Sequence, residues 1–206
     1  MATLVPLRRL AGETAELSDE ALLAACATGD AAALGALFDR FHEVVYRFAG
    51  RVAISDDARD DLVQATFLEV QRTAAKFRGL SSVRTWILGV TVNLARHVRR
   101  SEQRRRQREA RFVAHVEAAP VDVGAEVDQR MLLARVEQAI AELPHDPQVT
   151  FILCDLERLP VPEVARVLGV PEGTVWRRLH DARKVVRASV DPGGEGGTSP
   201  RNRRLR

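Results

Sequence analysis

The stretch from Pro160 to Arg187 places the strongest constraint on the fold of this chain, because its pattern predicts two short helices joined by a tight turn. Gly169 can end the first helix, since a residue without a Cβ atom adopts a positive φ easily. Pro171 is tolerated at the opening of the second helix. The apolar residues of the first helix lie on one stripe: Val164, Ala165 and Leu168.

The second helix of this stretch has two different faces. Apolar residues at i, i+4, i+7 and i+11 predict a buried face: Val175, Leu179, Ala182 and Val186. The other face carries an aromatic, a histidine and basic side chains: Trp176, Arg177, His180, Arg183 and Lys184. Such a pair of helices is typical of a helix-turn-helix, whose second helix lies in the major groove of DNA. A helical hairpin with a solvated charged face is the alternative.

The positive charge of the chain is concentrated in one segment. The formal net charge of the 206 residues is only +3, and Lys76 and Lys184 are the only lysines. Seven arginines, however, lie between Arg99 and Arg111, against two glutamates. Arginine binds phosphate through two parallel hydrogen bonds, and neutralised phosphates release counterions. This pattern therefore favours contact with nucleic acid.

Catalytic, metal and targeting signals are not found in the sequence. Cys26 and Cys154 lie far apart without metal-ligand spacing, so we expect no zinc, no disulfide framework and two buried thiols. The acidic run of residues 56–61 points to different sides of one helix and does not suit a metal site. No cofactor is expected. The N-terminus is unlike a signal peptide, and no apolar run is long enough to span a membrane, so we expect a soluble, cytoplasmic protein.

Nearly every segment with a periodic pattern predicts a helix, so we expect an all-α fold of two small domains joined by a linker, the second ending in the helix-turn-helix. Residues 1–17 are predicted to be a flexible leader, and residues 18–108 the first domain. Residues 109–127 are predicted to be the linker, and residues 128–188 the second domain. Residues 189–206 are Gly-rich and basic with little to bury, which predicts disorder.

One helix of the first domain, predicted from Asp57 to about Ala75, carries a second stripe beside its apolar one. Its residues recur at helical spacing and are polar except for one leucine: Asp57, Asp61, Gln64, Leu68 and Gln71. The stripe is either the solvated side of the helix or a face on which a partner docks, where an exposed leucine is expected among polar groups.

A loop over residues 77–82 is followed by a long helix, predicted from Ser82 to Arg108. Beside its core stripe runs a row made of an aromatic, an amide, an imidazole and arginines: Trp86, Asn93, His97, Arg100 and Arg104. Aromatics stack on bases, amides recognise base edges and arginine binds the backbone, so the row suits melted DNA. Packing of the tryptophan at the core boundary beside solvated arginines is the alternative.

Two segments in order carry a resemblance to a known family. DDLVQATFLEV, followed by KFRGLSSVRTWILGVTVNLARHVRR, is similar to the second conserved region of bacterial sigma factors. AELPHDPQVTFILCDLERLPVPEVARVLGVPEGTVWRRLHDARKVVR is similar to their fourth region. Together the segments resemble the extracytoplasmic-function (ECF) group over roughly residues 18–108 and 128–188. The resemblance implies a non-enzymatic promoter-specificity subunit of RNA polymerase.

The resemblance also implies partners and roles. The partners are core RNA polymerase, promoter DNA and an anti-sigma factor. The face that docks on core polymerase is then Asp57, Asp61, Gln64 and Leu68. The residues that capture the melted minus-ten strand are Phe77, Arg78, Gly79, Leu80, Ser81, Ser82, Trp86, Asn93, Arg96, His97 and Arg100. The residues that bind the minus-thirty-five duplex are Thr174, Trp176, Arg177, Arg178, His180, Arg183 and Lys184, with Thr174 and Arg178 on phosphate.

The sequence departs from the family pattern at four positions. Ala65 replaces an acidic residue, and His97 stands where aspartate is common. Trp176 replaces a lysine or arginine, and Asp181 stands where a basic residue is frequent. These last two changes predict an unusual promoter sequence. Two other functions stay open at this point: a helix-turn-helix regulator that acts without polymerase, and a helical nuclease that uses the acidic cluster.

Overall fold

The computed structural model describes residues 16–53, 55–109 and 128–190, and every regular element in these ranges is helical. The N-terminal domain contains α2 (Asp19–Ala27), α3 (Ala31–Val52), α4 (Asp56–Thr73), a 3₁₀ turn (Ala74–Lys76) and α5 (Val83–Glu109). The C-terminal domain contains α6 (Asp128–Glu142), α7 (His145–Phe151), a π turn (Ile152–Leu156), α8 (Val161–Leu168) and α9 (Glu172–Val190). The predicted leader, most of the linker and most of the tail lie outside the described residues, and the predicted domain bounds stay a prediction.

Short polar side chains begin the first three helices. The hydroxyl of Ser18 accepts a hydrogen bond from the Ala21 amide at 3.1 Å. The carboxylate of Asp30 accepts from the Ala32 amide at 2.8 Å, and the hydroxyl of Ser55 accepts from the Ala58 amide at 3.2 Å. Each satisfies an amide that has no partner within the helix. Short polar residues ahead of a helical pattern predict helix starts at Ser18, at Asp30 and within residues 55–57, and the structure confirms all three.

Each domain has its own buried core, which includes the predicted stripe of α8 and, except for the half-buried Val186, that of α9. In the N-terminal domain the fully buried side chains include Leu22, Leu37, Phe48, Val70 and Ile87. In the C-terminal domain they include Val149, Ile152, Leu153, Val164, Val175 and Leu179. Burial of one such side chain contributes roughly 1.5–3 kcal/mol. The helical, two-domain architecture is confirmed.

Apolar residues at helical spacing predict one helix with a core face formed by Val149, Ile152, Leu153 and Leu156, and the structure differs from this at the helix end. The Glu157 amide donates to the Ile152 carbonyl at 2.8 Å, which is the i to i+5 bond of a π turn. The extra residue in this turn rotates Leu156 outward, so this predicted core residue is 37% exposed. The same turn leaves Glu157 buried against the N-terminal domain.

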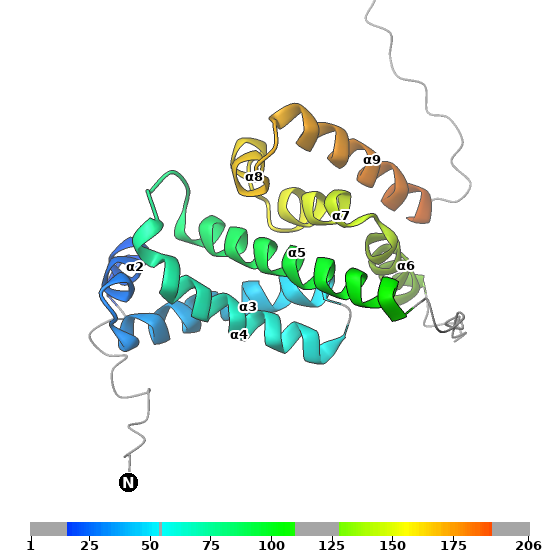
Figure 1. Cartoon of the computed structure of the whole chain (residues 1–206). Coiled ribbons are helices and arrows are strands. Elements are labelled where there is room, and N and C mark those ends of the chain that lie inside the picture. The colour runs from blue at the N-terminus through cyan, green and yellow to red at the C-terminus, as the bar shows by residue number, and fades with distance from the viewer. Residues whose placement is uncertain (1–15, 54, 110–127, 191–206) are drawn as a thin grey trace, which may run out of the picture.

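The two domains are docked on each other through α5. Figure 1 shows α7 and α8 on one side of α5, and α3 and α4 on its other side. Gly89 of α5 is buried under Val167 of α8, and a Cβ atom at Gly89 would lie 3.5 Å from Cγ1 of Val167. The Thr85 hydroxyl donates to the Glu163 carboxylate at 2.7 Å, and the Gln148 amide donates to the Arg51 carbonyl at 3.1 Å. Apolar packing and polar contacts therefore both contribute to the docked arrangement of the two domains.

Candidate nucleic-acid and polymerase interfaces

The turn between α8 and α9 has the geometry of a helix-turn-helix. Gly169 adopts φ 67°, in the left-handed region, and the Val170 amide donates to the Ala165 carbonyl at 3.1 Å. This glycine ends α8 as predicted. The inner face of α9 is buried at the predicted positions Val175, Leu179 and Ala182, so its opposite face points away from the domain core.

The outer face of α9 carries most of the predicted duplex-binding side chains. Trp176, Arg177, His180 and Lys184 are exposed, and Thr174 is half-buried. Within the described part of the chain, neither Arg177 nor Lys184 forms an ion pair or a hydrogen bond through its side chain. The charged ends of both side chains therefore lie in solvent.

Two other predicted duplex-binding arginines are bound to carboxylates of the same domain. Arg178 pairs with Asp146 of α7, and its side chain is only 17% exposed. Arg183 donates to Asp155 of the π turn through Nε at 2.8 Å and Nη2 at 2.6 Å. The hydrogen bond to Asp155 raises the pKa of Arg183. Both arginines therefore fix α9 on α7 and the π turn, and their contact with DNA stays a prediction.

The predicted strand-capturing residues lie in the α4–α5 loop and along one side of α5. Ser82 begins α5, where its hydroxyl accepts from the Thr85 amide at 3.1 Å. The half-buried ring of Trp86 packs edge-on against Phe77, with 5.7 Å between ring centroids. Seven of the predicted residues are exposed: Arg78, Gly79, Leu80, Ser82, Asn93, His97 and Arg100. Ser81 is half-buried, and the loop is turned by Gly79 at φ 68°.

Arg96 is separated from this row. It faces the C-terminal domain, where its Nη1 donates to the Leu168 carbonyl at 3.4 Å and its Nη2 lies 3.9 Å from Asp146. Burial lowers the pKa of Arg96. In the docked arrangement this arginine is therefore engaged by protein, while Asn93 and His97 are exposed to solvent.

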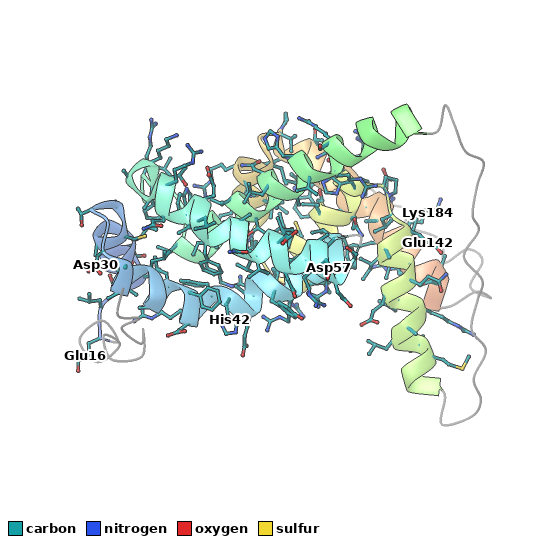
Figure 2. The ribbon with its side chains drawn as sticks, turned by 60° about the horizontal axis from the view of Figure 1, so that its bottom comes forward. Glu16, Asp30, His42, Asp57, Glu142 and Lys184 are labelled. Carbon is teal, nitrogen blue, oxygen red and sulfur yellow. The ribbon has the colours of Figure 1, made fainter. Side chains whose placement is uncertain are left out.

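The predicted polymerase-docking stripe lies on α4. Its four residues, Asp57, Asp61, Gln64 and Leu68, are all exposed. Beside them a groove of about 500 Å³ runs between α3 and α4, with an apolar floor that includes Leu34, Val63 and Phe67. Figure 2 is turned so that the side of α3 and α4 comes forward, with His42 labelled on α3 and Asp57 on α4.

The acidic run on α4 is partly neutralised by one arginine. Arg59 donates to Asp56 at 2.9 Å and to Asp60 at 3.0 Å. Across the described residues, no three histidine, cysteine or acidic side chains lie together in a way that could hold a metal ion. No helix in the described ranges is long and apolar enough to cross a bilayer.

Two family models of known proteins match the two segments of the sequence that resemble sigma factors. The Sigma-70 region 2 family model matches residues 37–105, and the Sigma-70, region 4 model matches residues 133–186. The ECF RNA polymerase sigma factor SigM of Mycobacterium tuberculosis is 33% identical over 174 residues, with 82% of each chain covered. The chain belongs to the ECF sigma factors. The RNA polymerase sigma factor HrpL of Pseudomonas syringae pv. syringae is 36% identical over 145 residues, which cover 69% of this sigma factor and 78% of HrpL.

Solved structures share the fold of this sigma factor. CnrH, in its complex with the cytosolic domain of CnrY, superimposes with a TM-score of 0.61 at 24% identity, covering 85% of this chain and 99% of CnrH. The sigma factor RpoE of Bartonella quintana, in complex with the anti-sigma factor NepR, gives a TM-score of 0.57 at 22% identity, covering 76% and 96%. The region 2 match lies within the N-terminal domain and the region 4 match within the C-terminal domain.

Sequence reasoning missed two aromatic residues at the edge of the groove. The spacing of Phe38 predicts a place in the apolar stripe of α3, yet it is 41% exposed, with 4.8 Å between its ring centroid and that of Phe67. Tyr46 is 43% exposed, and the guanidinium of Arg59 lies 4.3 Å from its ring centroid. Both residues lie at the edge of the apolar stripe of α3, whereas the core residues Leu37 and Phe41 lie at its centre. This position at the edge is the sequence signal that could have identified them as exposed.

Proposed function

We propose that this sigma factor directs promoter-specific initiation by binding core RNA polymerase and two promoter elements, without catalysing a reaction itself. We assign residues 18–108 to core polymerase and the minus-ten element, and residues 128–188 to the minus-thirty-five element. The observation that carries the proposal is the outer face of α9, where Trp176, Arg177 and His180 are exposed opposite a buried face. A helix that is buried on one face and exposes polar and aromatic side chains on the other can insert its exposed face into the major groove of DNA. The protein acts in the cytoplasm, where its polymerase is.

The N-terminal domain is proposed to hold the opened strand. Phe77 and Trp86 form an aromatic pair beside an exposed loop, and Asn93 and His97 extend from it along α5. An aromatic surface stacks on an unpaired base, and an adjacent amide recognises its edge. Flipping a base costs a few kcal/mol, so a site that receives it favours sequences that open easily.

Core polymerase is proposed to bind the stripe on α4. Asp57, Asp61 and Gln64 give the face its polar rim, and Leu68, at 58% exposed, gives it an apolar centre. This composition is typical of a protein interface. The face lies on the side of α5 away from α7 and α8 (Figure 1), so polymerase can dock while the C-terminal domain is still in place.

An anti-sigma factor is the third proposed partner. The similar structure of RpoE from Bartonella quintana contains the anti-sigma factor NepR. The likeness of fold supports a similar mode of control for this chain. A purified anti-sigma factor from the same cell should then form a stoichiometric complex and suppress transcription.

The deciding experiment is run-off transcription from a genomic fragment library, with core polymerase alone or supplemented with the purified protein. The proposal expects new start sites that share two upstream elements and that appear only with the protein. If the protein is instead a helix-turn-helix regulator that acts without polymerase, the isolated chain should bind specifically to duplex DNA. Adding it to core polymerase should then produce no new start sites. That result would refute the sigma-factor mechanism for this chain.

A further inference from the structure

Trp176 stands out because it is a large aromatic side chain that the fold does not bury. Its side chain is 55% exposed in the second turn of α9, while its neighbours Val175 and Leu179 are buried. A single exposed apolar residue needs no explanation in general, but this one lies in the part of a recognition helix that approaches base edges. Its exposure is therefore informative about what α9 contacts.

The contacts of the neighbouring arginines narrow the choice of residues that recognise bases. Arg178 is held by Asp146 and Arg183 by Asp155, so both are engaged within the domain. Among the predicted duplex-binding residues, Trp176, Arg177 and His180 then form the free N-terminal surface of α9. A guanidinium suits guanine, whereas an indole has one N–H donor, no acceptor and a wide apolar ring.

The surface around Gly173, three residues before Trp176 on the same side of α9, is open. A long side chain on a helix leans toward the preceding turn, which for Trp176 contains Glu172 and Gly173. Nothing lies within 4 Å of the position that a Cβ atom on Gly173 would occupy, and Gly173 itself is exposed. The absence of a side chain there leaves room for a base edge to approach the ring.

We propose that Trp176 recognises a thymine of the upstream promoter element by packing against its C5-methyl group in the major groove. This inference rests on the proposed function. Thymine is the base that presents an apolar group in the major groove, and the others present only hydrogen-bond donors and acceptors there. The O4 acceptor of thymine lies beside its methyl group, where the indole N–H can donate. Arg177 and His180 then recognise neighbouring base pairs.

The test removes only the methyl group. Promoters recovered from the run-off library are rebuilt with each thymine of the upstream element replaced in turn by deoxyuridine, which keeps the same pairing edge. Transcription by polymerase holding wild-type protein should fall about 3- to 5-fold at one position, as expected for loss of one buried methyl group. Replacement at the other thymines of the element should have no effect.

Variants connect the methyl effect to the indole. Trp176→Ala should transcribe thymine and deoxyuridine templates equally, and Trp176→Phe should keep most of the difference, since a phenyl ring also packs on a methyl group. Arg177→Ala is the matched control: it should lower transcription from both templates and leave their ratio unchanged. Because Trp176 and Arg177 are both exposed, these changes do not touch the core.

The outcomes separate this inference from the function on which it rests. Absence of any new start site with wild-type protein overturns the proposed function. Specific initiation with no sensitive thymine, or from upstream elements that contain no thymine, overturns the role of Trp176 alone. So does a methyl effect that persists in Trp176→Ala.

Discussion

Glu157 in the C-terminal domain is paired with Arg84 on α5 of the N-terminal domain, and only 4% of the Glu157 side chain is exposed. Arg84 also donates to the Glu157 carbonyl at 3.2 Å, and Arg51 of α3 lies 3.6 Å from the same carboxylate. One carboxylate thus holds two helices of the other domain. It reaches them because the π turn directs Glu157 toward α5.

Glu157→Ala should weaken the docking of the two domains. The change leaves Arg51 and Arg84 facing each other without a carboxylate, but both are about one-third exposed. We therefore expect a cost well below the roughly 3–5 kcal/mol of a wholly buried pair. Small-angle scattering should show a larger radius of gyration. Glu137→Ala, an exposed glutamate on α6, is the control and should leave the radius unchanged.

A disulfide between positions 89 and 167 should prevent initiation. A Cβ atom at Gly89 would lie 4.0 Å from Cβ of Val167, within the range of a disulfide. The minus-thirty-five and minus-ten elements are named by their positions, which are about 25 base pairs apart. At about 3.4 Å per base pair, this separation is on the order of 85 Å of DNA. Helices of both domains pack along α5, which has 27 residues and spans about 40 Å, so we expect the docked domains to be too close together to bind both elements.

The measurement is run-off transcription by Gly89→Cys/Val167→Cys protein before and after reduction. The oxidised protein should be inactive and the reduced protein active. The native thiols do not interfere, because burial raises the pKa of Cys26 and raises that of Cys154 to about 11. Val167→Cys alone controls for the substitution. Full activity of the crosslinked protein would show that the domains initiate without separating.

Local features of the fold were predictable from the sequence, because they depend on residues close together in the chain. Ser18 and Asp30 mark helix starts through side-chain hydrogen bonds to amides two or three residues later, and Gly169 marks a helix end through its left-handed backbone. The docked interface was not predicted. Arg84 and Glu157 are 73 residues apart, and no periodic pattern connects them. The pairing of Arg178 with Asp146 was missed for the same reason, since an arginine on an outward helix face has the same sequence pattern whether DNA or a carboxylate binds it.

Two adjacent arginines of α9 should behave differently when replaced by alanine. Arg177→Ala should weaken promoter-specific transcription by ~1–3 kcal/mol, if this residue forms a good base contact, and leave stability unchanged. Arg178→Ala should lower the free energy of unfolding by about 1 kcal/mol, because Asp146 loses its nearest partner. Transcription titrations and urea unfolding measure the two effects. Equal stability losses in both variants would contradict this division.

Asp61→Arg should abolish capture of core polymerase. Asp61 is exposed on the α4 stripe and is not part of the Arg59 cluster, so the change reverses a surface charge without breaking a described contact. Pull-down of core polymerase by the tagged protein measures the effect. Glu137→Arg makes the same charge change on α6 and should retain binding. Undiminished capture by the Asp61 variant would place the docking face elsewhere.

His145 should make the fold less stable in mild acid. It begins α7, and neither of its ring nitrogens has a hydrogen-bond partner in the described structure. Burial, with Arg99 and Arg96 nearby, lowers its pKa, and Asp146 offsets this only in part. The unfolded chain therefore binds a proton more readily than the folded one.

Because the ordinary histidine pKa is about 6.5, the free energy of unfolding should be highest above that pH and should fall as the pH drops below it. Urea unfolding between pH 5 and 8 measures this slope. His145→Phe keeps a ring of similar shape but cannot take up a proton, so its stability should depend less steeply on pH over this interval. An identical slope in the two proteins would assign the acid sensitivity to other groups.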